Sequence, residues 1–129
     1  MTGYVLDDLV LAAGFAGAER HRREVSRLLH DAVDGGPGVS VPALCLAHIA
    51  VTRPAVADHL AEIIVAAPQD SVKVCGLSRG ERLERLRDDV PALDWRATHA
   101  AVEAIITEWP VLTTDPRRYA GVPIDVLSL

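Results

Sequence analysis

The chain has 129 residues, half of them hydrophobic, and its 13 basic and 18 acidic side chains give a formal net charge of −5. This length and composition support one hydrophobic core without disulfides or a structural metal, so we expect a single domain over residues 1–129. The acidic balance argues against a protein that coats nucleic acid nonspecifically. The N-terminus carries acids where a signal peptide is basic, and no apolar run reaches the length of a membrane span. We therefore expect a cytoplasmic protein with no membrane partner.

Short apolar runs alternate with amphipathic stretches along the whole chain. Strands are predicted, in chain order, at residues 4–6, 39–41, 72–74, 111–113 and 124–127. Helices are predicted between them at about 8–15, 18–33, 42–49, 54–64, 78–86 and 94–108. Pro42 is expected to open one of these helices, and Ser78 with Glu81 is expected to form a capping box for another. Alternating strands and helices with short links predict a three-layer α/β/α sandwich around a mainly parallel sheet of four to five strands.

Two aspartates each end an apolar run, one near each terminus. Asp7 ends the run 4–6, and Asp115 ends the run 110–114. If both strands belong to one parallel sheet, their carboxylates lie at its carboxyl edge, where ligands bind in open α/β folds. Oxygen ligands at that edge suit a hard ion such as Mg²⁺ or Mn²⁺. Local roles are also open, because Asp7 or Asp8 can cap the next helix and an aspartate before a proline is a common turn.

The sequence contains Val5-Leu6-Asp7, Val41-Pro42-Ala43-Leu44, Ala97-Thr98-His99-Ala100-Ala101 and Leu112-Thr113-Thr114-Asp115-Pro116-Arg117-Arg118-Tyr119. These segments, and the order of the elements around them, resemble the PIN domain, the fold of the VapC-type toxin ribonucleases of bacterial toxin–antitoxin systems. The resemblance covers nearly the whole chain. It implies three or four acids that bind one or two Mg²⁺ or Mn²⁺ ions, whose activated water cleaves an RNA substrate. It also implies a homodimer and an antitoxin-like protein partner bound in a groove between helices.

Three positions match the acidic site that this resemblance implies. Asp7 matches the first acid and Asp115 the last acid, so these two are also metal ligands. Thr113 matches a threonine that positions a phosphate or a water molecule. Asp7, Asp115 and Thr113 are therefore the predicted catalytic residues.

Two positions depart from the implied site. His48 stands where the family has a glutamate, and the family's aspartate at the start of the penultimate helix falls within residues 96–98, which hold no acid. Asp94 is the nearest carboxylate, so Asp94, His48 and Asp8 are named as further metal-ligand candidates. An imidazole in place of a carboxylate weakens Mg²⁺ binding and favours Mn²⁺ or Zn²⁺, and a nearby arginine repels any cation.

Three functions stay open on the sequence alone. The first is a VapC-like ribonuclease whose metal-dependent activity is weakened or lost. The second is a non-catalytic protein- or RNA-binding module of the same fold with no cofactor, in which the basic group of residues 20–27 contacts RNA or forms a solvated helix face. Leu28-Leu29 and residues 63–65 supply either its binding surface or the core. The third is a receiver-like domain, which shares an acidic pair after its first strand, although the third strand here offers no aspartate for phosphorylation.

Overall fold

In the computed structural model, which describes residues 2–129, five parallel strands form one sheet in the order β3-β2-β1-β4-β5. The strands are β1 (Gly3–Leu6), β2 (Gly38–Pro42), β3 (Val72–Cys75), β4 (Val111–Thr113) and β5 (Val126–Ser128). Leu6 pairs with Leu112, so the carboxyl ends of β1 and β4 are neighbours. Receiver-type sheets have the order 2-1-3-4-5, so the receiver-like alternative is wrong.

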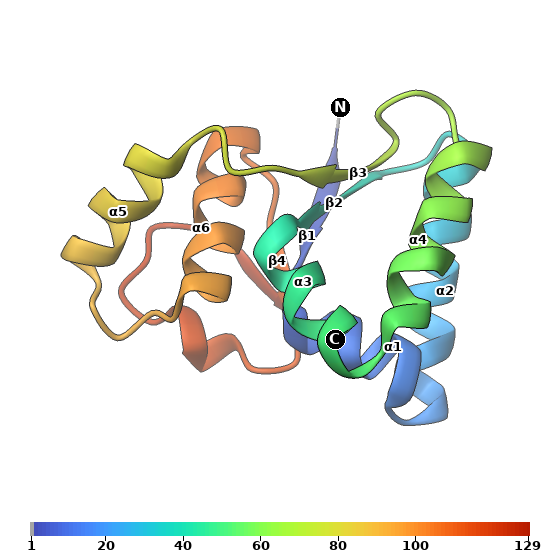
Figure 1. Ribbon diagram of the computed structural model, residues 1–129, viewed down its shortest axis with the longest axis horizontal. Coiled ribbons are helices and arrows are strands. Elements are labelled where there is room, and N and C mark those ends of the chain that lie inside the picture. The colour runs from blue at the N-terminus through green and yellow to red at the C-terminus, as the bar shows by residue number, and fades with distance from the viewer. Residues whose placement is uncertain (1) are drawn as a thin grey trace.

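The helices cover both faces of this sheet. They are α1 (Asp8–Ala16), α2 (Glu19–Val33), α3 (Ala43–Thr52), α4 (Pro54–Ala66), α5 (Gly80–Asp89), α6 (Trp95–Thr107) and the short 3₁₀ helix η1 (Pro116–Tyr119). Figure 1 shows α2 and α4 on one side of the strands and α5 and α6 on the other. Within the sandwich, α6 packs on the sheet and α5 packs on α6. The predicted α/β/α architecture with a parallel sheet is therefore confirmed.

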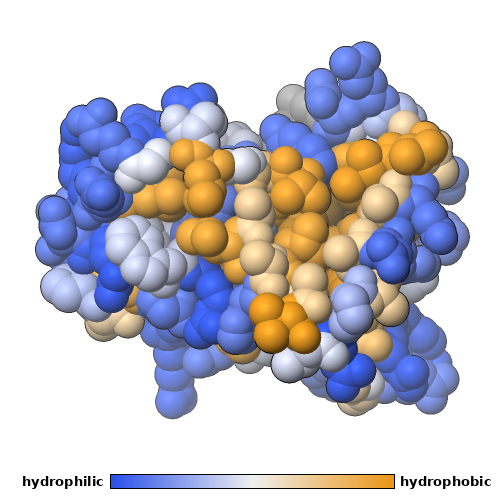
Figure 2. All heavy atoms as spheres, in the orientation of Figure 1, coloured by the Kyte–Doolittle hydropathy of each residue, from blue (hydrophilic) through white to orange (hydrophobic). Residues whose placement is uncertain are grey.

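The core lies between the sheet and these helices. β2 is buried along its whole length because it is an inner strand with helices on both faces. Apolar side chains are also visible in the middle of the face shown in Figure 2, over α3, β3 and α4. Within residues 2–129, no helix combines the length and the hydropathy needed to cross a bilayer.

Three predictions about element ends are wrong. The capping box at Ser78 does not form, because α5 begins at Gly80 after Arg79, and that cap position makes no side-chain hydrogen bond. Glu81 instead pairs with Arg85 one turn further on, at 2.9 Å. Pro42 is the last residue of β2 and keeps an extended backbone as the N-cap of α3, so it precedes the helix rather than opening it. The last strand also begins two residues later than predicted, at Val126.

Candidate functional site

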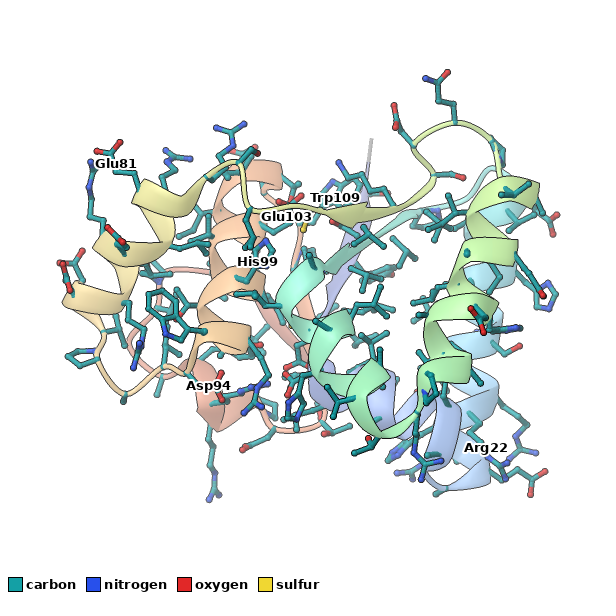
Figure 3. The ribbon with its side chains drawn as sticks, in the orientation of Figure 1. Arg22, Glu81, Asp94, His99, Glu103 and Trp109 are labelled. Atoms are coloured by element: carbon teal, nitrogen blue, oxygen red, sulfur yellow. The ribbon has the colours of Figure 1, made fainter. Side chains whose placement is uncertain are left out.

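Three carboxylates converge at the carboxyl edge of the sheet, and two of them cap helices. Asp7 follows β1 and caps α1, where its Oδ1 accepts a hydrogen bond from the Val10 amide at 3.0 Å. Asp8 is the next residue, and both side chains are buried. Asp94 caps α6 by accepting from the Ala97 amide at 2.8 Å, and it remains partly exposed. Figure 3 shows Asp94 at the start of α6.

One arginine contacts all three of these carboxylates. Arg118 lies on η1, which turns the chain back over the edge after β4. Its Nη1 lies 3.2 Å from Asp7 Oδ2 and also donates to Asp8 Oδ1. Its Nη2 donates to both oxygens of Asp94 at 3.0 Å. The Arg118 side chain is only 12% exposed, so these bonds form in a largely dry environment.

A second arginine, Arg96 on α6, closes the outer side of the cluster. Its Nη2 donates to Asp94 Oδ2 at 3.0 Å, and its Nε lies 3.4 Å from Asp8 Oδ2, without a hydrogen-bond partner. Its Nη1 lies 2.7 Å from Nδ1 and 3.0 Å from Nε2 of His48, an exposed residue of α3. Arg96 therefore contacts Asp8, Asp94 and His48 together.

Two hydroxyl groups complete the surroundings of Asp7. The Tyr119 hydroxyl donates to Asp7 Oδ2 at 2.8 Å, and both groups are buried. The hydroxyl of Thr113, which is fully buried, also bonds the Asp7 carboxylate. The same Thr113 oxygen accepts a hydrogen bond from the Asp115 amide at 3.2 Å. Thr113 therefore fixes both the buried acid and the turn that leads into η1.

Burial and hydrogen bonding act in opposite directions on Asp7. Burial is the largest effect and raises the pKa of Asp7 above its ordinary value. The bonds from Val10, Thr113 and Tyr119 and the charge of Arg118 act to lower that pKa and offset part of the burial effect. Burial also raises the pKa of Tyr119, as do the charge and hydrogen bond of Asp7. The Tyr119 hydroxyl is thus kept protonated as a donor.

Asp94 shows the opposite balance because it is less buried. Burial acts to raise its pKa, but the Ala97 amide and the guanidinium groups of Arg96 and Arg118 together lower the pKa of Asp94 to about 2. Burial acts to lower the pKa of Arg118, and the hydrogen bonds and charges of Asp8 and Asp94 outweigh it and raise the pKa. Both partners of this pair are therefore charged at neutral pH.

These residues do not fit a divalent cation as they are arranged. Mg²⁺ and Mn²⁺ need several oxygen lone pairs directed at one point. Here Asp7 bonds Arg118, and Asp8 and Asp94 each contact both arginines, so guanidinium N–H groups already contact oxygens of all three carboxylates. In the part of the chain that the structure describes, no three His, Cys, Asp or Glu side chains form a group that could hold a metal ion.

The structure brings together most, but not all, of the residues singled out in the sequence. Asp7, Asp8, Asp94 and Thr113 meet at the edge, and His48 reaches its rim through Arg96. By contrast, the exposed Asp115 precedes η1, and among residues 2–129 its carboxylate takes no part in the ion pairs of the cluster. The catalytic and metal-binding roles of all six residues stay predictions.

Sequence reasoning missed Arg118 and Tyr119 as site residues. The available signal was the spacing after Asp115-Pro116, because a proline that opens a short helix returns the residues two and three further on toward the strand end. A basic and an aromatic residue at that place face the acids that end the neighbouring strand. This inference requires that β1 and β4 be adjacent, which the sequence alone does not establish.

A hollow lies on another part of the molecule, between α1, α2 and α4. Its volume is about 420 Å³, and apolar residues form most of its wall: Gly14, Phe15, Val25, Leu29, Val33, Ile63 and Ala66. His30 and Ser26 line both this hollow and a neighbouring one that carries Arg22, Arg23 and Arg27. We call the combined depression the α2–α4 groove. Figure 3 shows Arg22 on the α2 side of the molecule, across from Asp94.

The strand order and the acids at the ends of two adjacent strands define a PIN-like α/β domain. Two solved structures of similar fold are chains in toxin–antitoxin assemblies. The chain is similar to one in a toxin–antitoxin complex from Klebsiella pneumoniae, with 14% identity, 97% of each chain covered and a TM-score of 0.68. It is also similar to one in VapBC2 from Rickettsia felis bound to a DNA fragment from their promoter, with 11% identity, 98% of each chain covered and a TM-score of 0.67.

No family model and no curated protein matches the sequence. At 14% and 11% identity, the likeness to the solved structures shows the fold alone. Any chemical activity must be argued from the residues of this chain. The fold expected from the resemblance to VapC-type toxins is thereby confirmed.

Proposed function

We propose that this chain is a VapC-like PIN domain whose metal-dependent RNA cleavage is lost or strongly weakened, and that its remaining function is to bind an antitoxin-like protein partner. The observation that carries the first half is the Arg118 guanidinium, which contacts Asp7, Asp8 and Asp94 together. A metal-activated water requires a cation at such acids, whereas binding a protein does not.

The two guanidinium charges disfavour a divalent ion at the acidic edge. At about 4 Å and an effective dielectric constant of about 20, one guanidinium repels a divalent ion by about 8 kcal/mol, as much as one carboxylate attracts it. Three carboxylates with two guanidiniums among them leave a formal charge of −1. One uncompensated negative charge offsets little of the dehydration that Mg²⁺ resists.

The experiment for this half is an RNA cleavage assay on the purified chain with Mg²⁺ or Mn²⁺. We expect no cleavage above that of an Asp7→Asn variant. Asp88→Asn is the control, because Asp88 is an exposed carboxylate on α5 that takes no part in the ion pairs of the cluster. Cleavage that requires the metal and is lost in the Asp7 variant would refute the proposal, whereas RNA binding without cleavage would favour the RNA-binding alternative.

The second half of the proposal rests on the α2–α4 groove. Its apolar wall suits the apolar face of a partner helix, and the adjacent Arg22, Arg23 and Arg27 suit acidic residues beside that face. We therefore commit to a partner segment that is amphipathic and acidic at one end. The two similar structures were determined as toxin–antitoxin assemblies, which supports an antitoxin-like source for this segment.

A labelled amphipathic helical peptide, with leucines on one face and glutamates at one end, tests this assignment by fluorescence anisotropy. We expect Arg23→Glu and Arg27→Glu to weaken its binding, because both side chains line the groove. Arg20→Glu is the control, since Arg20 lies on the same helix outside the lining residues. Equal loss in all three variants would point to nonspecific charge attraction and contradict the groove.

The remaining expectations keep their status as predictions. These are the homodimer and the cytoplasmic location. Exposed apolar side chains on α3, β3 and the segment after it, namely Val51, Val74 and Leu77, are compatible with self-association. Sedimentation velocity over a range of concentrations measures the oligomeric state directly.

A further inference from the structure

We infer that Arg118 and Arg96 serve as built-in counter-ions of the acidic edge, so that the chain folds without a divalent ion there and gains a Mn²⁺ site when the Arg118 charge is removed. We call the two side chains the arginine clamp. The inference deepens the proposed loss of metal chemistry and rests on the same carboxylates. The proposed function concerns RNA cleavage, whereas this inference concerns which cations neutralise the carboxylates at the acidic edge.

Arg118 uses both of its terminal guanidinium nitrogens as hydrogen-bond donors. Nη1 serves Asp7 and Asp8, and Nη2 serves both oxygens of Asp94, so the two terminal nitrogens bond three separate carboxylates. Charge-assisted bonds of this forked kind are the strong ones, and they fix geometry as well as charge. A lysine in the same place has one point charge and lacks the fork that spans these acids.

The clamp and the carboxylates that it contacts come from distant parts of the chain. Asp7 and Asp8 follow the first strand, Asp94 begins α6, and Arg118 follows the fourth strand. The clamp thus joins the N-terminal strand, the last long helix and the C-terminal segment at one point. Three carboxylates that meet at one edge repel one another unless cations lie between them, and here residues of the chain itself supply those cations.

Arg96 is the more exposed arginine of the clamp. Arg96 contacts Asp8 and Asp94, with a side chain 32% exposed. Its Nη1 faces the ring of His48 rather than a fourth acid. Arg96 thus contacts two of the carboxylates, whereas Arg118 at 12% exposure contacts all three. Removing Arg118 therefore uncovers more acid than removing Arg96.

The test is thermal unfolding of the full chain with MnCl₂, with MgCl₂ and with a chelator. The variants are Arg118→Gln, Arg96→Gln and the matched control Arg117→Gln, whose side chain is exposed on the same short helix. We expect the unaltered chain and Arg117→Gln to show no Mn²⁺-dependent rise in Tm. Arg118→Gln should melt at a lower temperature in chelator and recover part of the loss in Mn²⁺. Adding Asp7→Asn to Arg118→Gln should abolish that recovery.

Two results would overturn the arginine clamp. One is a Mn²⁺-dependent rise in Tm of the unaltered chain as large as that of Arg118→Gln. The other is no rise in either Arg118→Gln or the double variant Arg96→Gln/Arg118→Gln. If Arg118→Gln does not fold in chelator, its helical circular dichroism should return when MnCl₂ is added, and a failure to return in Mn²⁺ would count against the clamp.

The outcomes also separate this inference from the proposed function. If neither Arg118→Gln nor Arg96→Gln/Arg118→Gln gains Mn²⁺ stabilisation while the unaltered chain still cleaves no RNA, the clamp fails and the proposed loss of activity stands. If the unaltered chain cleaves RNA in Mn²⁺ and the Asp7→Asn variant does not, the proposed function fails, while the Mn²⁺-dependent changes in Tm still decide the clamp.

Discussion

The Arg118 guanidinium lies 3.2 Å from the carboxylate of Asp7, a residue 111 positions earlier in the chain. Asp7 is fully buried and Arg118 nearly so, which makes this an internal ion pair rather than a surface one. Breaking a buried pair by removing one partner costs more than a surface pair contributes, because the other charge is left without compensation. The pair therefore ties the two ends of the domain together across β1 and β4.

Replacing Tyr119 by phenylalanine removes a hydrogen bond to this buried carboxylate. The Tyr119 hydroxyl donates to Asp7 at 2.8 Å, and bonds to charged groups contribute about 1.5–3 kcal/mol. We expect Tyr119→Phe to lower the free energy of unfolding by about that amount in urea titrations. Tyr4→Phe is the control, because Tyr4 lies on β1 away from the acids, and a loss as large there would show that the effect is not specific to Asp7.

We expect the fall in the free energy of unfolding at acidic pH to depend on Asp94. Its folded pKa of about 2 lies below its ordinary value of 3.8. A carboxyl with a lowered folded pKa contributes stability that is present above its unfolded pKa and lost as pH falls toward the folded one. The loss should therefore occur between about pH 4 and pH 2, and its size is reduced by solvent screening because Asp94 is partly exposed.

An Asp94→Asn variant measures this contribution. Asparagine keeps the N-cap of α6 but not the charge. We expect the variant to be less stable than the unaltered chain at pH 5 and the two unfolding free energies to converge by about pH 2. Parallel curves over that range would mean that the ion pairs of Asp94 contribute nothing. Asp88→Asn, at an exposed position of α5, should leave the curve unchanged.

His99 is expected to make stability depend on pH in a different window. It is buried on α6, its Nδ1 accepts from the Leu44 amide at 3.4 Å, and its Nε2 lies 3.1 Å from the Gly76 carbonyl oxygen. The amide bond requires an unprotonated Nδ1, so Nε2 carries the proton and donates. Figure 3 shows His99 and Glu103 projecting from α6 toward β3.

Burial lowers the pKa of His99 below its ordinary value of 6.5, against the raising effects of Gly76 and Glu103. Since the unfolded chain then binds the proton more readily, stability should be complete above pH 6.5 and fall as pH drops toward the folded pKa. Urea unfolding at a series of pH values tests this. His99→Asn should be less stable at pH 8 and lose the dependence, whereas the exposed His30→Asn should retain it.

Gly14 is expected to be necessary for the packing of α1 on α2. An added Cβ at this position lies 2.7 Å from both methyl carbons of Val25, closer than real contacts allow. Helix propensity alone favours Gly14→Ala by about 1 kcal/mol, but overpacking costs about 1–3 kcal/mol. We therefore expect net destabilisation in urea titrations, and we expect Gly14→Ala to be better tolerated in a Val25→Ala background. Stabilisation by Gly14→Ala alone would refute this account.

The sequence predicted the framework because its signals are local. The central strands are apolar runs bounded by turns, and Asp7 and Asp94 stand where strand and helix patterns begin or end. Their convergence followed from the parallel sheet. The role of Arg118 did not follow, because it depends on which strands are neighbours and on the turn of η1. The capping box at Ser78 failed for a local reason, because α5 begins two residues later than predicted, at Gly80.

Calorimetric titration of MnCl₂ into the purified, chelator-treated chain tests the central claim most directly. If arginines occupy the acidic edge, no stoichiometric heat of binding should appear at millimolar or lower Mn²⁺, and Asp7→Asn should give the same trace as the unaltered chain. Tight binding of one or two Mn²⁺ ions that the Asp7 variant abolishes would contradict the account, because it would show that the carboxylates exchange their guanidinium partners for metal.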